Sequence, residues 1–151
     1  GGLLTTCTNM LSRLVAKDKM LVYTKDKKGK KEEFKSDSGK TVDVSMVVLV
    51  NGNTASASEI MTGCLKDYKK ATVVGTTTYG KGIVQTILPL TDGSAFKFTI
   101  AKYYTPKGTD IHEKGIKPDV EVKLASVLLN KDEITHEEDN QLQKALNVIE
   151  N

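Results

Sequence analysis

Residues 47–85 read VVLVNGNTASASEIMTGCLKDYKKATVVGTTTYGKGIVQ, and the rest of the chain can be interpreted outward from them. The β-branched run at 47–50 ends at the turn residues Asn51-Gly52-Asn53, which is typical of a buried strand. From Ala57, apolar residues recur at three- and four-residue spacing, which predicts a helix, and residues 71–75 predict a second strand. We therefore expect an α/β fold, with a sheet built around residues 46–50 and 72–76 and helices packed on it.

Ser56 lies at the predicted turn between the first strand and the helix. Together with Glu59 it matches the Ser-x-x-Glu capping signature. Such a position exposes the hydroxyl, and the unpaired N–H groups and positive dipole end of the helix can stabilise negative charge that develops nearby. The local pattern favours a simple helix cap, because serine is among the commonest residues there. A nucleophile is the alternative.

Lys81 lies between Gly80 and Gly82, which let the backbone turn sharply and approach another group closely. A lysine can take the proton of a serine hydroxyl only when apolar surroundings favour its neutral form, and no histidine or aspartate is then required. The alternative is a solvated surface lysine, in a chain of which 27% is charged. Gln85 likewise suits the polar face of the strand that follows.

Two rival chemistries are disfavoured by their context. Residues 75–81, GTTTYGK, fit the first seven positions of the phosphate-binding GxxxxGK[ST] loop, but Gly82 replaces the Ser or Thr and residues 83–88 predict a strand instead of a helix. His112 would be the base of a Ser–His site, yet no aspartate partner is identifiable for it, and His136 lies in an acidic tail.

Residues 54–60, TASASEI, and 75–86, GTTTYGKGIVQT, closely resemble two motifs of the carboxyl-terminal processing proteases, also called tail-specific proteases. These are Ser–Lys peptidases. Four other segments look like parts of the same family and occur in the same order, at residues 1–4, 88–95, 101–108 and 114–120. The resemblance extends over most of residues 1–124.

The resemblance implies a role for each matching residue. Ser56 would be the nucleophile, Lys81 the general base, and Gln85 the residue that orients the lysine. The N–H groups of Ala57 and of the glycine pair at residues 1–2, assigned to Gly2, would bind the oxyanion. The implied reaction is hydrolysis of peptide bonds near the C-termini of protein substrates through an acyl-enzyme, on a core sheet similar to that of the crotonase and ClpP-like folds.

The composition suits a single soluble domain with a core: 151 residues, 38% hydrophobic, with a net charge of +3. We interpret residues 1–151 as a fragment of a peptidase catalytic core, with the motifs within 1–124. The lysines are dispersed, so nucleic acid is not an expected partner. The expected partners are unstructured C-terminal tails of proteins or peptides, and self-association stays open. No cofactor or metal is expected, because neither paired cysteines nor clustered histidines are present.

No signal peptide or membrane span is visible in the sequence. The resemblance implies an extracytoplasmic protein of the cell envelope, periplasm or medium, whose export signal would precede this fragment. No segment can be assigned to the PDZ domain with which the family captures substrate tails, so we expect low activity from the fragment. The alternatives are a catalytically inactive binding or scaffold module of the same fold and, less readily, a nucleotide binder.

The remaining segments predict elements that frame the site. Residues 3–17 predict an amphipathic helix, 20–24 and 33–35 a hairpin with a charged tip, and 83–90 and 94–105 an antiparallel pair. The acidic tail predicts a final helix at about 135–150, with Thr135 and Glu138 as its capping box. Cys7 and Cys64 lie on apolar helix faces and are interpreted as buried hydrophobic residues instead of a disulfide.

Overall fold

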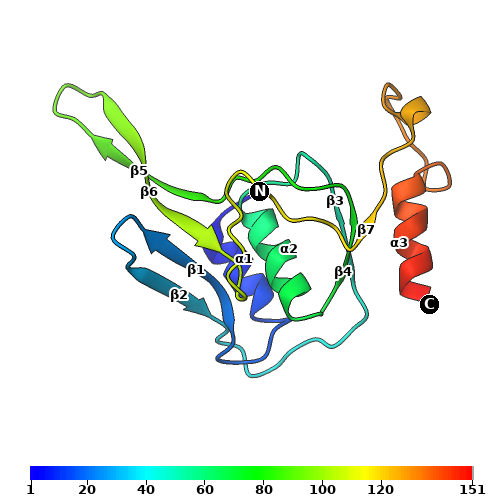
Figure 1. Ribbon diagram of the computed structural model, residues 1–151, viewed down its shortest axis with the longest axis horizontal. Coiled ribbons are helices and arrows are strands. Elements are labelled where there is room, and N and C mark those ends of the chain that lie inside the picture. Colours follow the sequence, from blue (N-terminus) through cyan, green and yellow to red (C-terminus); the bar gives the residue numbers. More distant parts are fainter. Residues whose placement is uncertain (151) are drawn as a thin grey trace.

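The computed structural model describes residues 1–150 and shows a layered α/β arrangement (Figure 1). An antiparallel sheet forms one side, and helices α1 (Leu4–Leu11) and α2 (Ala57–Asp67) pack in the middle. A parallel sheet follows, and helix α3 (Asn140–Glu150) covers its outer face. The expected α/β class is confirmed, and the strands divide between two sheets. No helix within residues 1–150 is both long and apolar enough to cross a bilayer.

The parallel sheet has the order β3-β4-β7, formed by β3 (Val47–Val50), β4 (Thr72–Gly75) and β7 (Val120–Glu121). The two strands expected at its centre pair in parallel, with Val50 opposite Gly75. Gly75 has φ 131°, and a methyl group there would overlap the carbonyl oxygen of Val50. Only glycine therefore lets β4 end tightly against β3, where the loops of the candidate site begin.

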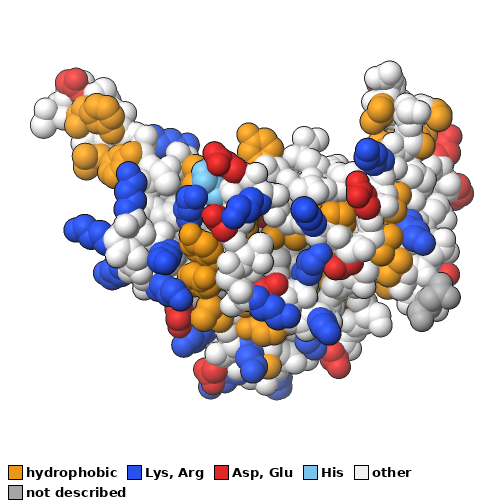
Figure 2. Space-filling view, viewed as in Figure 1, with side chains coloured by type: hydrophobic (Ala, Val, Ile, Leu, Met, Phe, Trp, Pro, Cys, Tyr) orange, Lys and Arg blue, Asp and Glu red, His pale blue; other side chains and the backbone are white. Residues whose placement is uncertain are grey.

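The antiparallel sheet has the order β2-β1-β6-β5, formed by β1 (Met20–Asp26), β2 (Lys31–Lys35), β5 (Ile83–Pro89) and β6 (Ala95–Tyr104). Both predicted antiparallel pairs are confirmed. The Asp26 side chain closes the first hairpin by accepting the N–H groups of Lys28 and Lys30, each at 2.8 Å. The β5–β6 hairpin projects from the body as an arm, and hydrophobic side chains gather at its tip (Figure 2).

The main core lies around α1 and α2. Leu11 of α1, Cys64 of α2, Leu21 of β1 and Ile111 are fully buried in it. Helix α2 also packs closely on the segment after β6, because a methyl group at Gly63 would lie 2.6 Å from Thr105 Cγ2. Both cysteines are free and buried, as expected. The core thus holds the helix that follows Ser56 in a fixed place.

The first helix is shorter than predicted. Helix α1 ends at Leu11 instead of reaching residue 17, and turns follow it. The segment after β2 returns to this region: the Ser36 hydroxyl donates to the Val15 carbonyl at 2.9 Å, and the Val42 N–H donates to the Arg13 carbonyl at 2.7 Å. Bonds from a distant segment therefore replace the last turns of the helix.

The final helix starts later than predicted, and its cap is a different residue. Helix α3 begins at Asn140, and the Asp139 carboxylate accepts the N–H groups of Gln141 and Leu142, at 2.9 and 3.0 Å. The Thr135–Glu138 pair expected as the capping box belongs to the preceding turn, in which the Glu138 N–H donates to the Thr135 carbonyl. An aspartate next to the first free N–H groups is the better-placed acceptor.

Candidate active site

Ser56 lies on a tight turn between β3 and α2, in an unusual backbone conformation. Its φ is 58° and its ψ is −121°, a region that residues other than glycine rarely adopt. Strain of this kind costs about 1–3 kcal/mol and is often found at active sites. A sharp strand-to-helix turn is also where serine hydrolases of α/β fold present their nucleophile.

The buried carboxylate of Glu59 joins the serine turn to the lysine loop. One oxygen, Oε2, accepts the N–H of Ser56 at 2.8 Å and the N–H of Lys81 at 2.9 Å. The other, Oε1, accepts the Thr78 hydroxyl at 2.5 Å and the Gly80 N–H at 2.6 Å. The side chain is fully buried. The Ser56 and Lys81 amides therefore meet at a single oxygen atom, although the residues are far apart in sequence.

The glycines around Lys81 are required by close backbone contacts. A methyl group at Gly82 would collide with the N–H of His112, and the Glu113 N–H donates to the Gly80 carbonyl at 2.9 Å. The loop thus packs directly on the segment before Gly115. The Lys81 side chain is exposed and lines an open cavity of about 850 Å³, together with Asn53, Ala55, Tyr79, Gly80, Ile83, His112 and Glu113.

The two predicted oxyanion donors line a different cavity from the one that Lys81 lines. Ala57 is the first residue of α2 and is buried, while Gly2 is exposed; both line a cavity of about 230 Å³. The glycine pair approaches the serine closely, because a methyl group at Gly1 would lie 3.6 Å from Ser56 Cβ. The Cys7 thiol donates to the Ala57 carbonyl at 3.3 Å, and burial raises the pKa of this thiol to about 11.

Among the described residues, no hydrogen bond joins the Gln85 side chain to Lys81. Gln85 lies exposed on β5, opposite Thr99 and beside a shift in register. It does not line the cavity that Lys81 lines. Its assignment as the residue that orients Lys81 therefore stays a prediction.

The geometry also bears on the rival chemistries. The chain after Lys81 forms strand β5, so the helix N-terminus that a phosphate-binding loop requires is missing there. His112 lines the lysine cavity, but its buried Nδ1 has no hydrogen-bond partner within residues 1–150. The Glu113 carboxylate lies 3.8 Å from His112 Nε2, which is too far for the hydrogen bond that orients the ring in a Ser–His site. Among these residues, no group of His, Cys, Asp and Glu side chains could hold a metal ion.

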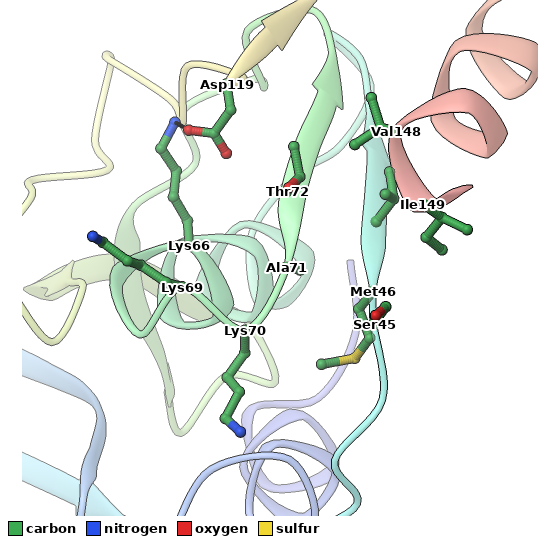
Figure 3. Close-up of a pocket in the computed structure, with 11 residues that line it drawn as sticks. Ser45, Met46, Lys66, Lys69, Lys70, Ala71, Thr72, Asp119, Val148 and Ile149 are labelled. Carbon is green, nitrogen blue, oxygen red and sulfur yellow. Dashed lines mark ion pairs between the residues drawn. The ribbon is translucent and has the colours of Figure 1, made fainter. Parts of the chain in front are cut away.

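Another cavity, of about 510 Å³, lies beneath the C-terminal end of α3 (Figure 3). Val148 and Ile149 line it from α3, and three lysines at the end of α2 diverge around it. Lys66 pairs with Asp119 at 2.9 Å, and Lys70 pairs with Asp43 at 3.0 Å. The three lysine side chains point away from one another, and two of them are paired with carboxylates. They therefore do not converge on one ligand, and this cavity is not the candidate site.

Fold and site together define the class: an α/β protein that presents a serine at a strained strand-to-helix turn, beside a glycine-bounded lysine loop. The model of peptidase family S41 matches residues 1–122, and the chain belongs to this family. Membership agrees with the resemblance that the sequence motifs indicated.

Individual relatives support the same placement. The chain is 42% identical over 149 residues to a carboxyl-terminal-processing protease of Synechocystis sp., covering 99% of this chain and 34% of that protein. It is 46% identical over 126 residues to a probable CtpA-like serine protease of Staphylococcus epidermidis, covering 81% and 25%. Among solved structures, the photosystem II D1 C-terminal processing protease has a TM-score of 0.76 at 40% identity, covering 82% of this chain and 32% of that one. The chain thus spans about a third of the length of these relatives or less.

Proposed function

We propose that this chain is the catalytic core of a serine endopeptidase that uses Ser56 as nucleophile and Lys81 as general base. The observation that carries the proposal is the Glu59 carboxylate, whose Oε2 accepts the amides of both residues. One buried side chain thereby keeps the serine turn and the lysine loop in a fixed relation. Fixed placement of this kind is what a proton transfer between two side chains requires.

The reaction would proceed in two halves. Ser56 Oγ forms a bond to the substrate carbonyl carbon while its proton passes to Lys81 Nζ, and Lys81 then gives that proton to the departing amine as the C–N bond breaks. In the second half, water attacks the carbonyl carbon of the resulting ester and its proton passes to Lys81. The bond from that carbon to Ser56 Oγ then breaks, and Lys81 returns the proton to Oγ. The N–H groups of Ala57 and Gly2 would bind the oxyanion of both tetrahedral intermediates.

The proposed substrates are unstructured C-terminal tails of proteins, cleaved near their ends, and Gln85 would orient Lys81. The support is membership of family S41 and the printed names of the relatives, which are processing proteases. For the same reason we propose that the protein works outside the cytoplasm. Fractionation of cells that express the complete gene product tests this: recovery only in the cytoplasmic fraction would contradict it.

Paired serine variants of the complete gene product test the nucleophile. Ser56→Ala should lower the rate of cleavage of an unstructured peptide by more than about a thousandfold and leave the melting temperature nearly unchanged. Ser58→Ala is the matched control, because it removes a hydroxyl two residues away, in the first turn of α2, and it should lower the rate by less than about tenfold. Equal losses in both variants, or normal cleavage by Ser56→Ala, would exclude Ser56 as the nucleophile. A protein that binds the peptide but never cleaves it would instead be the inactive binding module.

A further inference from the structure

One face of the β5–β6 arm carries an apolar strip that no other element within residues 1–150 covers. Strand β6 pairs with β1 only over residues 101–104, so residues 95–100 pair with β5 alone. Side chains alternate along a strand, and residues opposite each other on paired strands share a face. The strip consists of Leu88, Phe96, Phe98 and Ile100, which are 53%, 63%, 45% and 43% exposed. Apolar side chains gathered on a projecting element mark an interaction surface (Figure 2).

The strip points away from the two core helices. At the base of the arm, Tyr103 of β6 lies opposite Thr24 of β1, and both side chains are buried, so they define the inner face of the sheet. Lys102 and Lys25, which also lie opposite each other, therefore belong to the other face. Ile100 is two residues before Lys102 and shares its face. We call this side of the antiparallel sheet, with the strip and these lysines, the outer face.

A row of three lysines crosses the outer face beside the strip. Lys25 of β1 lies directly opposite Lys31 of β2 and Lys102 of β6. Like charges in this position destabilise a sheet. Within residues 1–150 no carboxylate forms an ion pair with Lys25 or Lys31, and the Lys102 ammonium lies 3.7 Å from an Asp110 oxygen. The Glu33 carboxylate on the same face is paired with another lysine of β2. The row is therefore largely uncompensated and attracts anionic groups.

The turn between β1 and β2 adds positive charge next to this row. Residues 26–31 contain four lysines, and their single carboxylate, on Asp26, already accepts two backbone N–H groups of the turn. Lys25 and Lys102 line a cavity of about 250 Å³ together with Ile100, the last residue of the apolar strip. The basic and the apolar parts of the outer face are thus contiguous.

From this arrangement we propose that the outer face docks on a lipid bilayer that contains anionic headgroups. The apolar strip enters the boundary between headgroups and acyl chains, and the lysine row contacts lipid phosphates. A bilayer fits both parts, because it is apolar inside and anionic at its boundary. A free anion would engage the lysines alone, and a second copy of the chain would bring the same lysines without an anionic partner for them.

The arm lies along the bilayer surface instead of entering it end-on. The turn at its tip carries the Asp92 carboxylate, and a charged group is costly inside the acyl layer. Membrane docking is separate from the proposed peptidase chemistry, because neither Ser56 nor Lys81 belongs to the outer face.

Binding to vesicles of defined composition tests the outer face in the complete gene product. The vesicles contain phosphatidylcholine alone or its mixture with anionic phosphatidylglycerol, and sedimentation measures the partition coefficient. The wild type should bind the anionic vesicles at least about tenfold more tightly than the neutral ones. About 0.5 M NaCl should remove most of this difference, because salt screens exposed charges.

Substitutions in each part of the outer face should weaken binding to the anionic vesicles. Phe96→Ser should lower the partition coefficient at least about tenfold, and Lys25→Gln about fivefold. The matched controls are Val127→Ser and Lys144→Gln, at exposed positions outside the antiparallel sheet, and they should change it less than about twofold. All four positions are exposed, so the melting temperature and the cleavage of a short soluble peptide should stay near those of the wild type.

Three results would overturn membrane docking: no binding to the anionic vesicles, equal binding to both kinds, or wild-type partition of both Phe96→Ser and Lys25→Gln. A dimer in analytical ultracentrifugation that Phe96→Ser dissociates, without vesicle binding, would assign the outer face to a second copy of the chain instead. Ser56→Ala should bind the vesicles as the wild type does, so a failure of the peptidase proposal leaves the vesicle result standing.

Discussion

Glu59 is the residue on which the geometry of the site depends most. Its carboxylate is fully buried and accepts hydrogen bonds from Ser56, Thr78, Gly80 and Lys81. Three of these donors are backbone N–H groups, which would be left without an acceptor if the carboxylate were removed. Each unsatisfied buried donor costs about 1–3 kcal/mol. One side chain thus stabilises the fold and aligns the two loops.

We predict that Glu59→Ala lowers the free energy of unfolding by at least about 3 kcal/mol, because several buried donors lose their acceptor at once. Urea denaturation measures the change. Glu113→Ala is the control, since the Glu113 side chain is 83% exposed, and it should change the free energy by no more than about 0.5 kcal/mol. Similar effects from both substitutions would show that the Glu59 network does not hold the loops.

The two buried thiols predict a dependence of stability on alkaline pH. Burial raises the pKa of Cys7 from 9.0 to about 11 and that of Cys64 to about 12. Above pH 9 the unfolded chain loses these protons while the folded chain keeps them, so ionisation stabilises the unfolded state. Ionisation of the thiols should therefore leave the free energy of unfolding unchanged below pH 9. Between pH 9 and pH 11 it should lower this free energy by at most about 1.4 kcal/mol per pH unit for each thiol.

Urea denaturation at several pH values between 8 and 11 measures this slope. Burial also raises the pKa of Tyr68 and Tyr103, which contributes in the same direction, so the comparison is made with a Cys64→Ala variant. The variant should be less stable at pH 8 and should show a shallower fall above pH 9. An identical slope in both proteins would mean that the Cys64 thiol ionises as readily in the folded chain as in the unfolded one.

Ser56 and Lys81 could be selected as candidates from the sequence because residues 54–60 and 75–86 resemble two motifs of a known family, whereas the local pattern at Ser56 alone favours a helix cap. The role of Glu59 could not, because its position three residues after Ser56 indicates only a cap. Glu59 also accepts hydrogen bonds from residues 78–81. These bonds form only because that loop packs against the same helix, which is a tertiary contact. The signal that would have pointed to it is a lone carboxylate directly before Ile60 and Met61, next to the apolar face of the predicted helix.

At the scale of elements, the junction of β3 and β4 depends on Gly75. We predict that Gly75→Ala destabilises the protein by more than about 3 kcal/mol, because the new methyl group would overlap the Val50 carbonyl at an unfavourable φ. The melting temperature measures the loss. Gly39→Ala is the control: a methyl group there meets nothing within 4 Å, so it should shift stability by no more than about 0.5 kcal/mol. A stable Gly75→Ala protein would contradict the close β3–β4 contact.

Element types were predictable from hydrophobic periodicity, but element ends were not. Helix α1 stops at Leu11 because Ser36 and Val42 bond to residues after it, and nothing within the helix itself signals this. Helix α3 begins after Asp139, although Thr135 and Glu138 fit a capping box equally well in sequence. In both cases the local sequence was compatible with more than one helix end. Contacts with a distant segment decide where α1 ends, and the better-placed Asp139 side chain decides where α3 begins.

At the scale of the whole molecule, the candidate site lies where the chain passes from the parallel sheet to the antiparallel one. β3 and β4 end at the serine turn and at the segment before Lys81, and β5 of the other sheet begins two residues after Lys81. Ligands of open α/β sheets bind outside the carboxyl ends of their strands, and the site follows this rule. The division into two sheets around α1 and α2 could not be read from periodicity, because strand pairing is decided by contacts between distant segments.

The central claim is that Ser56 becomes acylated with the help of Lys81. The most direct measurement is mass spectrometry of the complete gene product, mixed with a short peptide ester, quenched with acid and digested. We predict an acyl group on the fragment that contains Ser56, located on that residue, and its loss in Lys81→Arg, because a guanidinium stays protonated and cannot accept the serine proton. An acyl group on Ser58 or elsewhere, or hydrolysis at an undiminished rate by Lys81→Arg, would contradict the Ser56–Lys81 assignment.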